Sequence, residues 1–299
     1  MVETGVRTMS SEEPNPDTKK EDWPRISVVT LTRDSENYIS DLLDSLTHQS
    51  VEPYEVLVID CNSKDRTPEI VKKYAEKYPY IRFYNIPGTR GYSRNAGAKL
   101  AKGDVIAFID SDAIANALWI EELQKSFREG ADVVAGREVR LGYAGWSGLK
   151  RVGIYHKGQD ISYPSVNLAY RRELFEKIDG FDPWFKEAEE IDLNYRAVEA
   201  GAKIVYNPDA IVYHRARETF KGFFKQAFWY GFGRKELTLR HGSLWSEYDF
   251  IDMLKIGKNE SIWKIIRLFV AFLGYMTCKF FKGSWELKRK WRESELSSR

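Results

Sequence analysis

Cysteine is scarce in this chain of 299 residues, in which only Cys61 and Cys278 occur. Two thiols so far apart in the sequence exclude a disulfide framework and a thiolate metal site. The first 24 residues contain no apolar run of the kind that forms the core of a secretory signal peptide. We therefore expect a protein of the reducing cytoplasm in which residues 1–24 form a disordered polar tail.

A long hydrophobic run is also missing. The apolar run at residues 268–278 has eleven residues, whereas a membrane-spanning helix needs about 20. Residues 255–299 nevertheless carry eleven Lys and Arg against four Glu, a net charge of +7, so the rest of the chain sums to −5. Two interpretations stay open: a helix packed on the main domain, or an in-plane helix that attaches the protein peripherally to the anionic cytoplasmic face of a membrane.

No internal repeat or low-complexity segment is present, which excludes solenoid and array folds. From Ile26 onward, short apolar runs alternate with segments of helical periodicity, which is the pattern of βαβ units around a parallel sheet. The runs are short and apolar on both faces, as expected of buried parallel strands. We predict strands at residues 26–31, 55–60, 81–85, 104–110 and 132–136, and a pair of strand-like runs at 203–207 and 210–214.

Helices are predicted between these strands. One covers residues 38–46, where apolar side chains recur on a single helical stripe. The next begins at Thr67, which is suited to cap it, with Pro68 in its first turn. A further helix runs from about Asn116 to a terminating Gly130.

Polar side chains follow three of the predicted strands at their carboxyl ends, where ligands bind in open α/β sheets. Asp110 directly follows the apolar run VIAFI, so it lies at the sheet edge, where it and Asp112 converge on a hard cation. Such carboxylates suit Mg²⁺ or Mn²⁺, which neutralises the charge that grows on a departing nucleoside diphosphate. The structural alternative is that Asp112 caps the helix near Asn116.

Two further residues are candidates for contacts to a nucleotide, each with a structural alternative. Asp60 ends the second strand, where acidic residues accept hydrogen bonds from a base or ribose in other nucleotide-binding folds. Its alternative is a turn residue that bonds the backbone of Asn62 or Ser63. Arg94 lies early in a helix and is suited to clamp a phosphate or an Asp of the metal pair, the alternative being an exposed, solvated Arg.

Four ordered blocks of the sequence, which cover about residues 25–217, resemble the family 2 glycosyltransferases of GT-A fold. They are ISVVTLTRDSENYI, VLVIDCNSKDRTPEI, GTRGYSRNAGAKLAKGDVIAFIDSDA and EAEEIDLNYRAVEAGAKIVYNPDAIVYH. The resemblance implies an α/β fold of GT-A type, with a mostly parallel central sheet flanked by helices. It also implies a nucleotide-diphosphate sugar donor, a divalent metal (Mn²⁺ or Mg²⁺) at the Asp-x-Asp motif, and inversion at the anomeric carbon.

The same resemblance divides the chain. We expect a catalytic domain at residues 25–218, with a nucleotide-binding half at 25–136 and an acceptor-side half at 137–218. A helical region rich in aromatic and basic residues follows at 219–299. Its segment 220–237 interleaves seven aromatic with four basic residues, which suits an acceptor, a membrane surface or phosphates, or a packed amphipathic helix.

Roles for single residues on the nucleotide side follow from the resemblance, position by position. Thr32 and Arg33 would line the nucleotide pocket, and Asp60 would face the base or ribose. Arg94 and Asn95 match the Arg-Asn pair that follows the third strand in such proteins.

The resemblance also assigns residues around the metal and the donor sugar. Asp110 and Asp112 would be the metal motif, with Ser111 between them in contact with the nucleotide sugar. His214 matches a histidine near the metal in many relatives, so it is a candidate third ligand, although a lone His is more often structural. Asn167 sits where the family places residues beside the donor sugar, and its alternative is a polar strand end satisfied by backbone.

Two departures from the family pattern are visible. The usual Pro-Thr-Tyr-Asn after the first strand reads Leu-Thr-Arg-Asp at residues 31–34, which leaves the nucleotide open. The usual Glu-Asp base motif reads Glu189-Glu190, so Glu190 is the leading candidate for the general base and Glu189 the reserve. With Asp192 they form an acidic cluster in which like charges raise a pKa, the alternative being a solvated helix start.

The sequence thus favours an enzyme that moves a sugar from a nucleotide-diphosphate sugar to a hydroxyl acceptor, lipid-linked or polysaccharide, by metal-assisted displacement. We expect no nucleic-acid partner. One alternative is a catalytically silent nucleotide-sugar-binding protein tethered at a membrane. A second, a sugar nucleotidyltransferase, would need a Gly-rich phosphate loop after the first strand, and TLTRDSEN contains no Gly.

Overall fold

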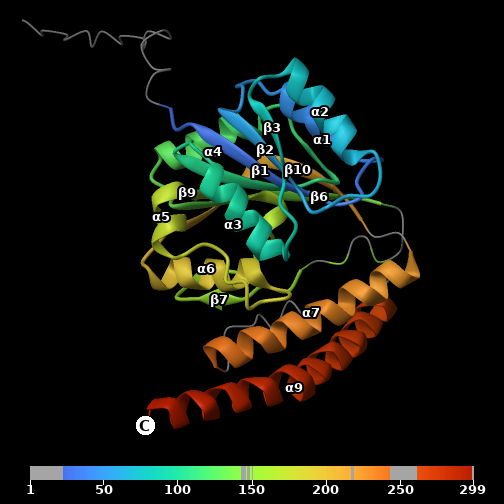
Figure 1. Ribbon diagram of the computed structural model, residues 1–299, viewed down its shortest axis with the longest axis vertical. Helices are drawn as coiled ribbons and strands as arrows, with labels where there is room; N and C mark the ends of the chain where they lie inside the picture. Colours follow the sequence, from blue (N-terminus) through green and yellow to red (C-terminus); the bar gives the residue numbers. More distant parts are fainter. Residues whose placement is uncertain are drawn as a thin grey trace, which may run out of the picture.

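The computed structural model describes residues 23–142, 146, 149, 151–216, 219–242 and 261–297. The predicted polar tail therefore lies outside the described residues except for its last two, and residues 243–260 of the C-terminal region also lie outside them. Within the described part, helices cover both faces of a central sheet, and two long helices run together below it (Figure 1).

A single large sheet forms the centre of the molecule. Its strands are β1 (Ile26–Thr32), β2 (Glu55–Asp60), β3 (Ile81–Asn85), β4 (Val105–Asp110), β5 (Ala113–Ala115), β6 (Val133–Leu141), β9 (Leu168–Arg171) and β10 (Ile204–Arg215). They lie in the order β3-β2-β1-β4-β9-β6-β10-β5. β9 and β5 pair antiparallel to their neighbours and the other pairs are parallel, which confirms the mostly parallel α/β sheet. A separate hairpin joins β7 (Tyr155–His156) to β8 (Gln159–Asp160).

Helices are divided between the two faces of this sheet. They are α1 (Ile39–Thr47), α2 (Thr67–Lys77), α3 (Arg90–Leu100), α4 (Trp119–Arg128), α5 (Arg172–Lys177), α6 (Glu189–Glu199), α7 (Phe220–His241) and α9 (Ser261–Ser297), with a 3-10 helix η2 (Ser165–Asn167). Because successive strand residues point to opposite faces, Val28 packs with α1, α2 and α4, whereas Val29 packs with α3, α5 and α6. The predicted burial on both faces is confirmed for β1, β2 and β4, whereas most residues of β3 are only partly buried.

The runs at residues 203–207 and 210–214 form one strand instead of two. Asn207 and Ile211 of β10 pair with consecutive residues of β6, so residues 208–210 bulge out between them. The side chain of Asn207 accepts hydrogen bonds from the backbone of Asp209 (2.8 Å) and Ala210 (3.2 Å), which stabilises the bulge. The strand therefore continues past Pro208 to reach the sheet edge at His214.

One predicted helix cap is wrong, and one predicted helix start is displaced. Helix α2 begins at Thr67 as predicted, but the Thr67 hydroxyl donates to Asp65 (2.5 Å) and does not cap the helix. Helix α4 begins at Trp119 after β5, so Asp112 lies too far upstream to cap it. Asn116 accepts the backbone N–H of Leu118 (3.0 Å) at that start instead.

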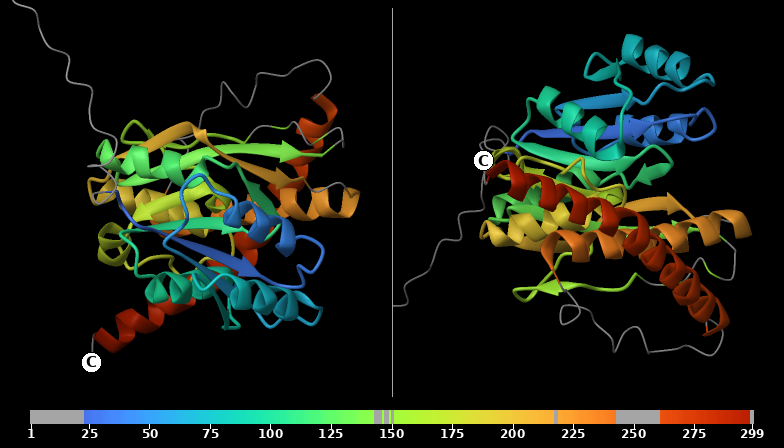
Figure 2. Two further views of the ribbon diagram at one scale, coloured as in Figure 1. Left: turned by 90° about the horizontal axis from the view of Figure 1, so that it is seen from above. Right: turned by 60° about the horizontal axis from the view of Figure 1, so that its bottom comes forward.

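The C-terminal helices α7 and α9 pack closely against each other, and α9 lies on the side away from the sheet (Figure 2). Two glycines allow this approach. A Cβ at Gly231 of α7 would lie 1.7 Å from the carbonyl oxygen of Ala271, and one at Gly274 of α9 would lie 1.9 Å from that of Phe228. The predicted helical C-terminal region is therefore present, and the backbones of its two helices are in contact.

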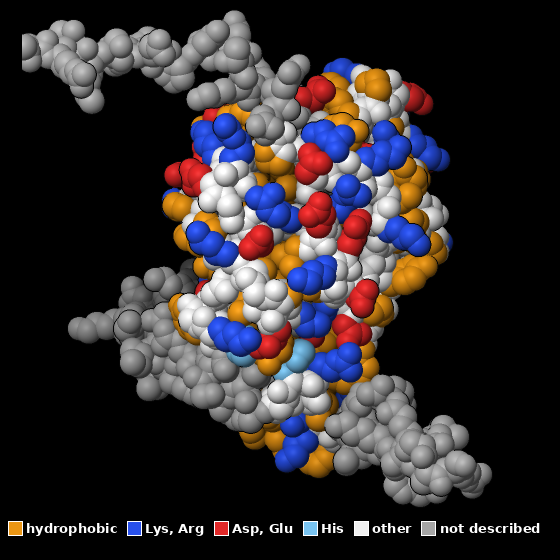
Figure 3. All heavy atoms as spheres, turned by 90° about the vertical axis from the view of Figure 1, so that its left-hand side faces the viewer, with side chains coloured by type: hydrophobic (Ala, Val, Ile, Leu, Met, Phe, Trp, Pro, Cys, Tyr) orange, Lys and Arg blue, Asp and Glu red, His pale blue; other side chains and the backbone are white. Residues whose placement is uncertain are grey.

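Among the described helices, none combines the length and apolarity that a membrane crossing requires. Helix α9 instead leaves large apolar side chains exposed along one side, at Ile262, Ile265, Phe269 and Phe272. The coloured part of the face in Figure 3 intersperses acidic and basic side chains, so no field of a single sign forms there.

A Gly274→Ala substitution tests the packing of the two helices. In an exposed helix the change would stabilise by up to about 1 kcal/mol, but here the new Cβ meets the backbone of α7. We expect a loss of about 1–3 kcal/mol, measured by urea unfolding. Thr277→Ala, on the same helix and bonded only to its own preceding turn, should cost little, and equal stabilities of the two variants would contradict the packing.

Candidate active site

The carboxyl ends of three parallel strands meet at one edge of the sheet. In the register, Thr32 of β1 pairs with Asp60 of β2, and Leu31 pairs with Asp110 of β4. Thr32 and Asp60 are each 1% exposed, whereas the side chain of Arg33 is 73% exposed. The structure therefore brings the predicted nucleotide-side residues together at the edge where ligands bind in open α/β sheets.

Hydrogen bonds fix the loops that follow β1 and β2. Asp60 accepts the backbone N–H of Ser63 (3.0 Å) and its hydroxyl (2.5 Å), so the predicted turn role of Asp60 is confirmed. The Ser63 hydroxyl accepts the N–H of Asp34 (2.9 Å), and Asp34 accepts the N–H of Lys64 (2.7 Å). Because each loop supports the other, the sheet edge at β1 and β2 is held in a fixed shape before any ligand binds.

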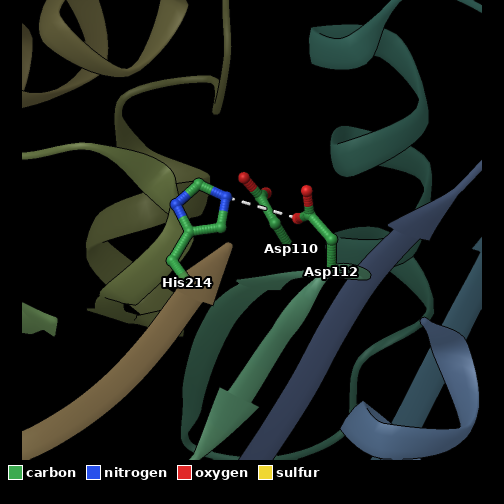
Figure 4. A group of neighbouring side chains, drawn as sticks. All are labelled: Asp110, Asp112 and His214. Carbon is green, nitrogen blue, oxygen red and sulfur yellow. Dashed lines mark ion pairs between the residues drawn. The ribbon is translucent and has the colours of Figure 1, made fainter. Parts of the chain in front are cut away.

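Asp110, Asp112 and His214 come together from three elements, as Figure 4 shows. Asp110 ends β4, Asp112 lies in the turn before β5, and the pairing of β5 with β10 sets His214 opposite Ala113. Potential ligand atoms of the three all lie within 4.8 Å of one another. Two carboxylates and one imidazole are a donor set suited to Mn²⁺ or Mg²⁺, so these residues fit the implied metal.

The imidazole of His214 is oriented by a second carboxylate. Its Nδ1 lies 2.9 Å from Glu138 of β6, while its Nε2 lies 3.3 Å from Asp112. Burial would lower the pKa of His214, but Asp112 and Glu138 outweigh it and raise the pKa to about 10. Burial would likewise raise the pKa of Glu138, but His214 and Arg140 lower it to about 2. The pair thus directs Nε2 of His214 toward the two aspartates.

Sequence reasoning missed Glu138. The predicted strand ended at Gly136 because its apolar run ends there, whereas β6 continues through polar residues to Leu141. A signal for this extension was present in the spacing, since Glu138 and Arg140 alternate with Val139 as expected of a half-buried strand.

Arg94 connects the metal group to the acidic cluster. It lies on α3 with a side chain only 6% exposed, and it donates to Asp110 (3.2 Å) and to Glu189 (2.8 Å). Arg94 therefore contacts an Asp of the metal pair, as one of the two interpretations predicted. The other interpretation, an exposed and solvated Arg94, is wrong. A buried guanidinium between two carboxylates holds both at a fixed separation.

Glu189 and Glu190 begin α6 and have different surroundings. Glu189 is 2% exposed and is paired with Arg94 and, at 3.7 Å, with Arg90. Glu190 is half-buried, and among the described residues no basic side chain lies within ion-pair distance of it. Burial and the charge of Glu189 raise the pKa of Glu190 to about 7. The site therefore holds one restrained carboxylate beside one that can exchange a proton near neutral pH.

Three other predicted residues use their polar groups within the protein. Asp192 is 0% exposed and binds Arg196 (2.7 Å) and His241 (2.7 Å), which ties α6 to α7. These buried contacts differ from the solvated helix start that was the alternative, and they give Asp192 a structural role between the two helices.

Asn95 bonds both the N–H (2.8 Å) and the carbonyl (2.7 Å) of Phe181, so its amide fixes the turn that leads toward α6. Asn167 is 2% exposed. It accepts from Trp119 (2.9 Å) and donates to the carbonyl of Ala210 (2.8 Å) in the β10 bulge. These contacts match the structural alternative for Asn167. Ser111, by contrast, lies at the site, with its hydroxyl 3.0 Å from that of Ser35.

The chain is similar to known proteins in both sequence and fold. Residues 27–178 match the family model described as glycosyl transferase family 2. The chain is 27% identical to the glucosyl-dolichyl phosphate glucuronosyltransferase of Haloferax volcanii, over 72% of this chain and 78% of that protein. It is 26% identical to the O-antigen chain rhamnosyltransferase RfbN of Salmonella typhimurium, over 92% and 98%.

The fold is similar to that of the mannosyltransferase PcManGT from Pyrobaculum calidifontis, solved in complex with GDP-Man and Mn²⁺. The TM-score is 0.59 at 18% identity, and the match covers 87% of this chain and 76% of that one. At this identity the likeness shows the fold, which is of GT-A type.

Proposed function

Because this chain belongs to the family 2 glycosyltransferases, we propose that it transfers a sugar from a nucleotide-diphosphate sugar to a hydroxyl acceptor with inversion. The arrangement that carries the proposal is a metal-ligand group that Arg94 joins to Glu189, with the carboxylate of raised pKa, Glu190, next to Glu189 in the chain. An acceptor held beside Glu190 would attack a donor that is held by its diphosphate at the metal-ligand group. The attack would come from the side opposite the leaving group, as single displacement requires.

On the donor side, Asp110, Asp112 and His214 would hold Mn²⁺ or Mg²⁺. The bound ion would supply Lewis-acid stabilisation of the departing nucleoside diphosphate. Thr32, Arg33 and Asp60 are proposed to contact the nucleotide, since their strand ends lie beside Asp110. The exposed guanidinium of Arg33 is available for a phosphate or base.

On the acceptor side, Glu190 is the proposed general base. An acceptor hydroxyl becomes a strong nucleophile only as its proton is removed, and the Glu190 carboxylate would take that proton during attack. A pKa of about 7 leaves the group largely unprotonated above neutrality while keeping it basic enough for the transfer. Glu189 is the second candidate for the base by its position. Its ion pair with Arg94 instead favours a structural role in which it holds the Arg94 guanidinium in place.

We also propose peripheral attachment to the cytoplasmic face of a membrane and a lipid-linked acceptor. Helix α9 exposes Ile262 (63%), Phe269 (63%) and Phe272 (58%) at spacings of one helical face. Lys264 and Lys279 are placed to reach lipid headgroups around that face. The name of the Haloferax relative, which refers to a dolichyl phosphate, supports such an acceptor here.

The first prediction concerns the metal site. Asp112→Ala should abolish nucleoside diphosphate release from a panel of UDP-, GDP- and dTDP-sugars with Mn²⁺ or Mg²⁺, because one of the metal carboxylates is lost. Thermal unfolding should stay near wild type, since Asp112 lies in a half-exposed turn. Asp209→Ala, on the exposed bulge of β10, is the matched control. Metal-dependent turnover by Asp112→Ala would show that the site assignment is wrong.

A second prediction concerns pH. Glu190 acts in its unprotonated form, so the wild-type kcat/KM should fall as the pH drops through about 7, the raised pKa of this group. Glu190→Gln should lose that acid limb and roughly 10²–10⁴ of kcat. Glu199→Gln, which changes an exposed acid on the same helix, should keep both the acid limb and the wild-type kcat.

Stability provides a check on Glu190 that is independent of activity. A raised carboxyl pKa means that the folded state binds more protons than the unfolded state between pH 4.5 and about 7. Wild-type stability therefore loses a contribution as the pH rises through this window, and Glu190→Gln should be spared that loss. Parallel stability profiles for the two proteins would contradict the raised pKa.

The membrane proposal predicts flotation of the full-length protein with anionic liposomes. Phe269→Glu combined with Phe272→Glu should leave the protein at the bottom of the gradient, because two charges enter the apolar face. Leu118→Glu, at an exposed apolar position away from α9, should float like wild type. Equal behaviour of the wild type and the α9 variant would rule out attachment through this face.

A further inference from the structure

The turn at residues 186–188 sets the start of α6 and hence the direction of Glu189 and Glu190. Ala188, the residue before α6, has a φ of +59°. A non-glycine residue in this left-handed region is strained by about 1–2 kcal/mol, and such a conformation persists only where surrounding contacts fix it. Contacts from outside the turn must therefore hold it.

Arg90 of α3 provides one contact, since it donates to the carbonyl oxygen of Lys186 (3.2 Å) and pairs with Glu187. Glu236 of α7 provides another. Its side chain is 0% exposed. Its carboxylate accepts the backbone N–H of Lys186 (3.1 Å) and the backbone N–H of Glu187 (2.9 Å). Two backbone donors of the strained turn thus converge on one buried carboxylate, which fixes both peptide units at once.

Lys282 of α9 compensates the buried charge of Glu236. Its ammonium group forms an ion pair with Glu236 and also donates to the carbonyl oxygen of Trp184 (2.6 Å). It lies 3.6 Å from the centre of the Trp184 ring, within range of a cation–π interaction. An isolated carboxylate in this position would be costly, so the second C-terminal helix completes the support of the turn.

The shape of α7 is adapted to the same turn. A Cβ at Gly233 would lie 3.0 Å from the Cβ atoms of Ala188 and Glu187. The helix therefore approaches the turn more closely than most larger residues would allow at this position. Gly233 and Glu236 lie three residues apart, so both are on the side of α7 that faces the turn.

We propose that Glu236 is a positioning residue for the transfer reaction, acting through the turn at residues 186–188 on the general base. This inference rests on the proposed role of Glu190. Without the Glu236 carboxylate the turn relaxes toward an unstrained conformation, and the carboxylates that begin α6 move. A displacement of about 1 Å is enough to slow a reaction substantially.

Donor binding should be much less affected than the reaction itself. Asp110, Asp112 and His214 lie on or beside β4, β5 and β10, whereas the Glu236 carboxylate bonds Lys186, Glu187 and Lys282. Loss of positioning therefore lowers kcat while nucleotide affinity stays near wild type. A general loss of structure would lower both, which separates the two explanations.

The experiment compares full-length wild type, Glu236→Gln and the control Glu176→Gln, which makes the same change at an exposed site on α5. Hydrogen exchange of a peptide spanning residues 184–190 should accelerate about tenfold in Glu236→Gln alone. With Mn²⁺ and the donor found active, kcat should fall roughly 10- to 100-fold. The affinity for the matching nucleoside diphosphate with Mn²⁺ should be retained.

Gly233→Ala provides a second route to the same turn without altering a charge, and it should reproduce the fall in kcat. Unchanged exchange in Glu236→Gln would overturn the inference, as would faster exchange with wild-type kcat, or a parallel loss of nucleotide affinity. If the wild type transfers no sugar, the proposed function fails, while the exchange comparison still decides whether Glu236 holds the turn.

Discussion

The buried guanidinium of Arg94 lies between carboxylates that come from distant parts of the chain. Asp110 ends β4, and Glu189 begins α6. Without a cation between them, these acids and the neighbouring Glu190 would repel one another in a partly desolvated site. Arg94 thus makes a single site from two halves, while Glu190 is left without a basic partner among the described residues.

The acceptor side depends on a second layer of structure outside the family-model match. Helices α7 and α9 pack through glycines, and α7 contacts the turn before α6 through Gly233 and Glu236. The α9 helix supplies Lys282 to that contact while its other residues expose an apolar face. The helix that we propose to meet the membrane, α9, therefore also contributes to the support of the proposed base.

Much of the nucleotide side is predictable from sequence, because its strands are continuous apolar runs that end in polar residues. Asp110 and Asp112 could be placed at the edge of the sheet for this reason. The acceptor side is less predictable, because polar residues enter its strands. β6 continues beyond its apolar run, and β10 passes through a bulge at Pro208, so neither can be delimited by hydrophobicity alone.

Contacts between distant segments explain the remaining differences. The pairing of His214 with Glu138 follows from the register of β10 on β6, and no local pattern encodes a register. Asn167 and Asp192 have the residue types expected of a site, but their side chains are satisfied by Trp119 and His241, which are remote in sequence. Composition predicts which groups can do chemistry, and tertiary packing decides which remain free to do it.

The central claim is that a divalent ion and a nucleoside diphosphate meet at Asp110, Asp112 and His214. Anomalous diffraction from crystals grown with Mn²⁺ and the nucleoside diphosphate of the active donor tests it most directly. We predict one manganese peak bonded to these three side chains and to the diphosphate oxygens. A diphosphate bound elsewhere, or a manganese ion that avoids both aspartates, would contradict this account.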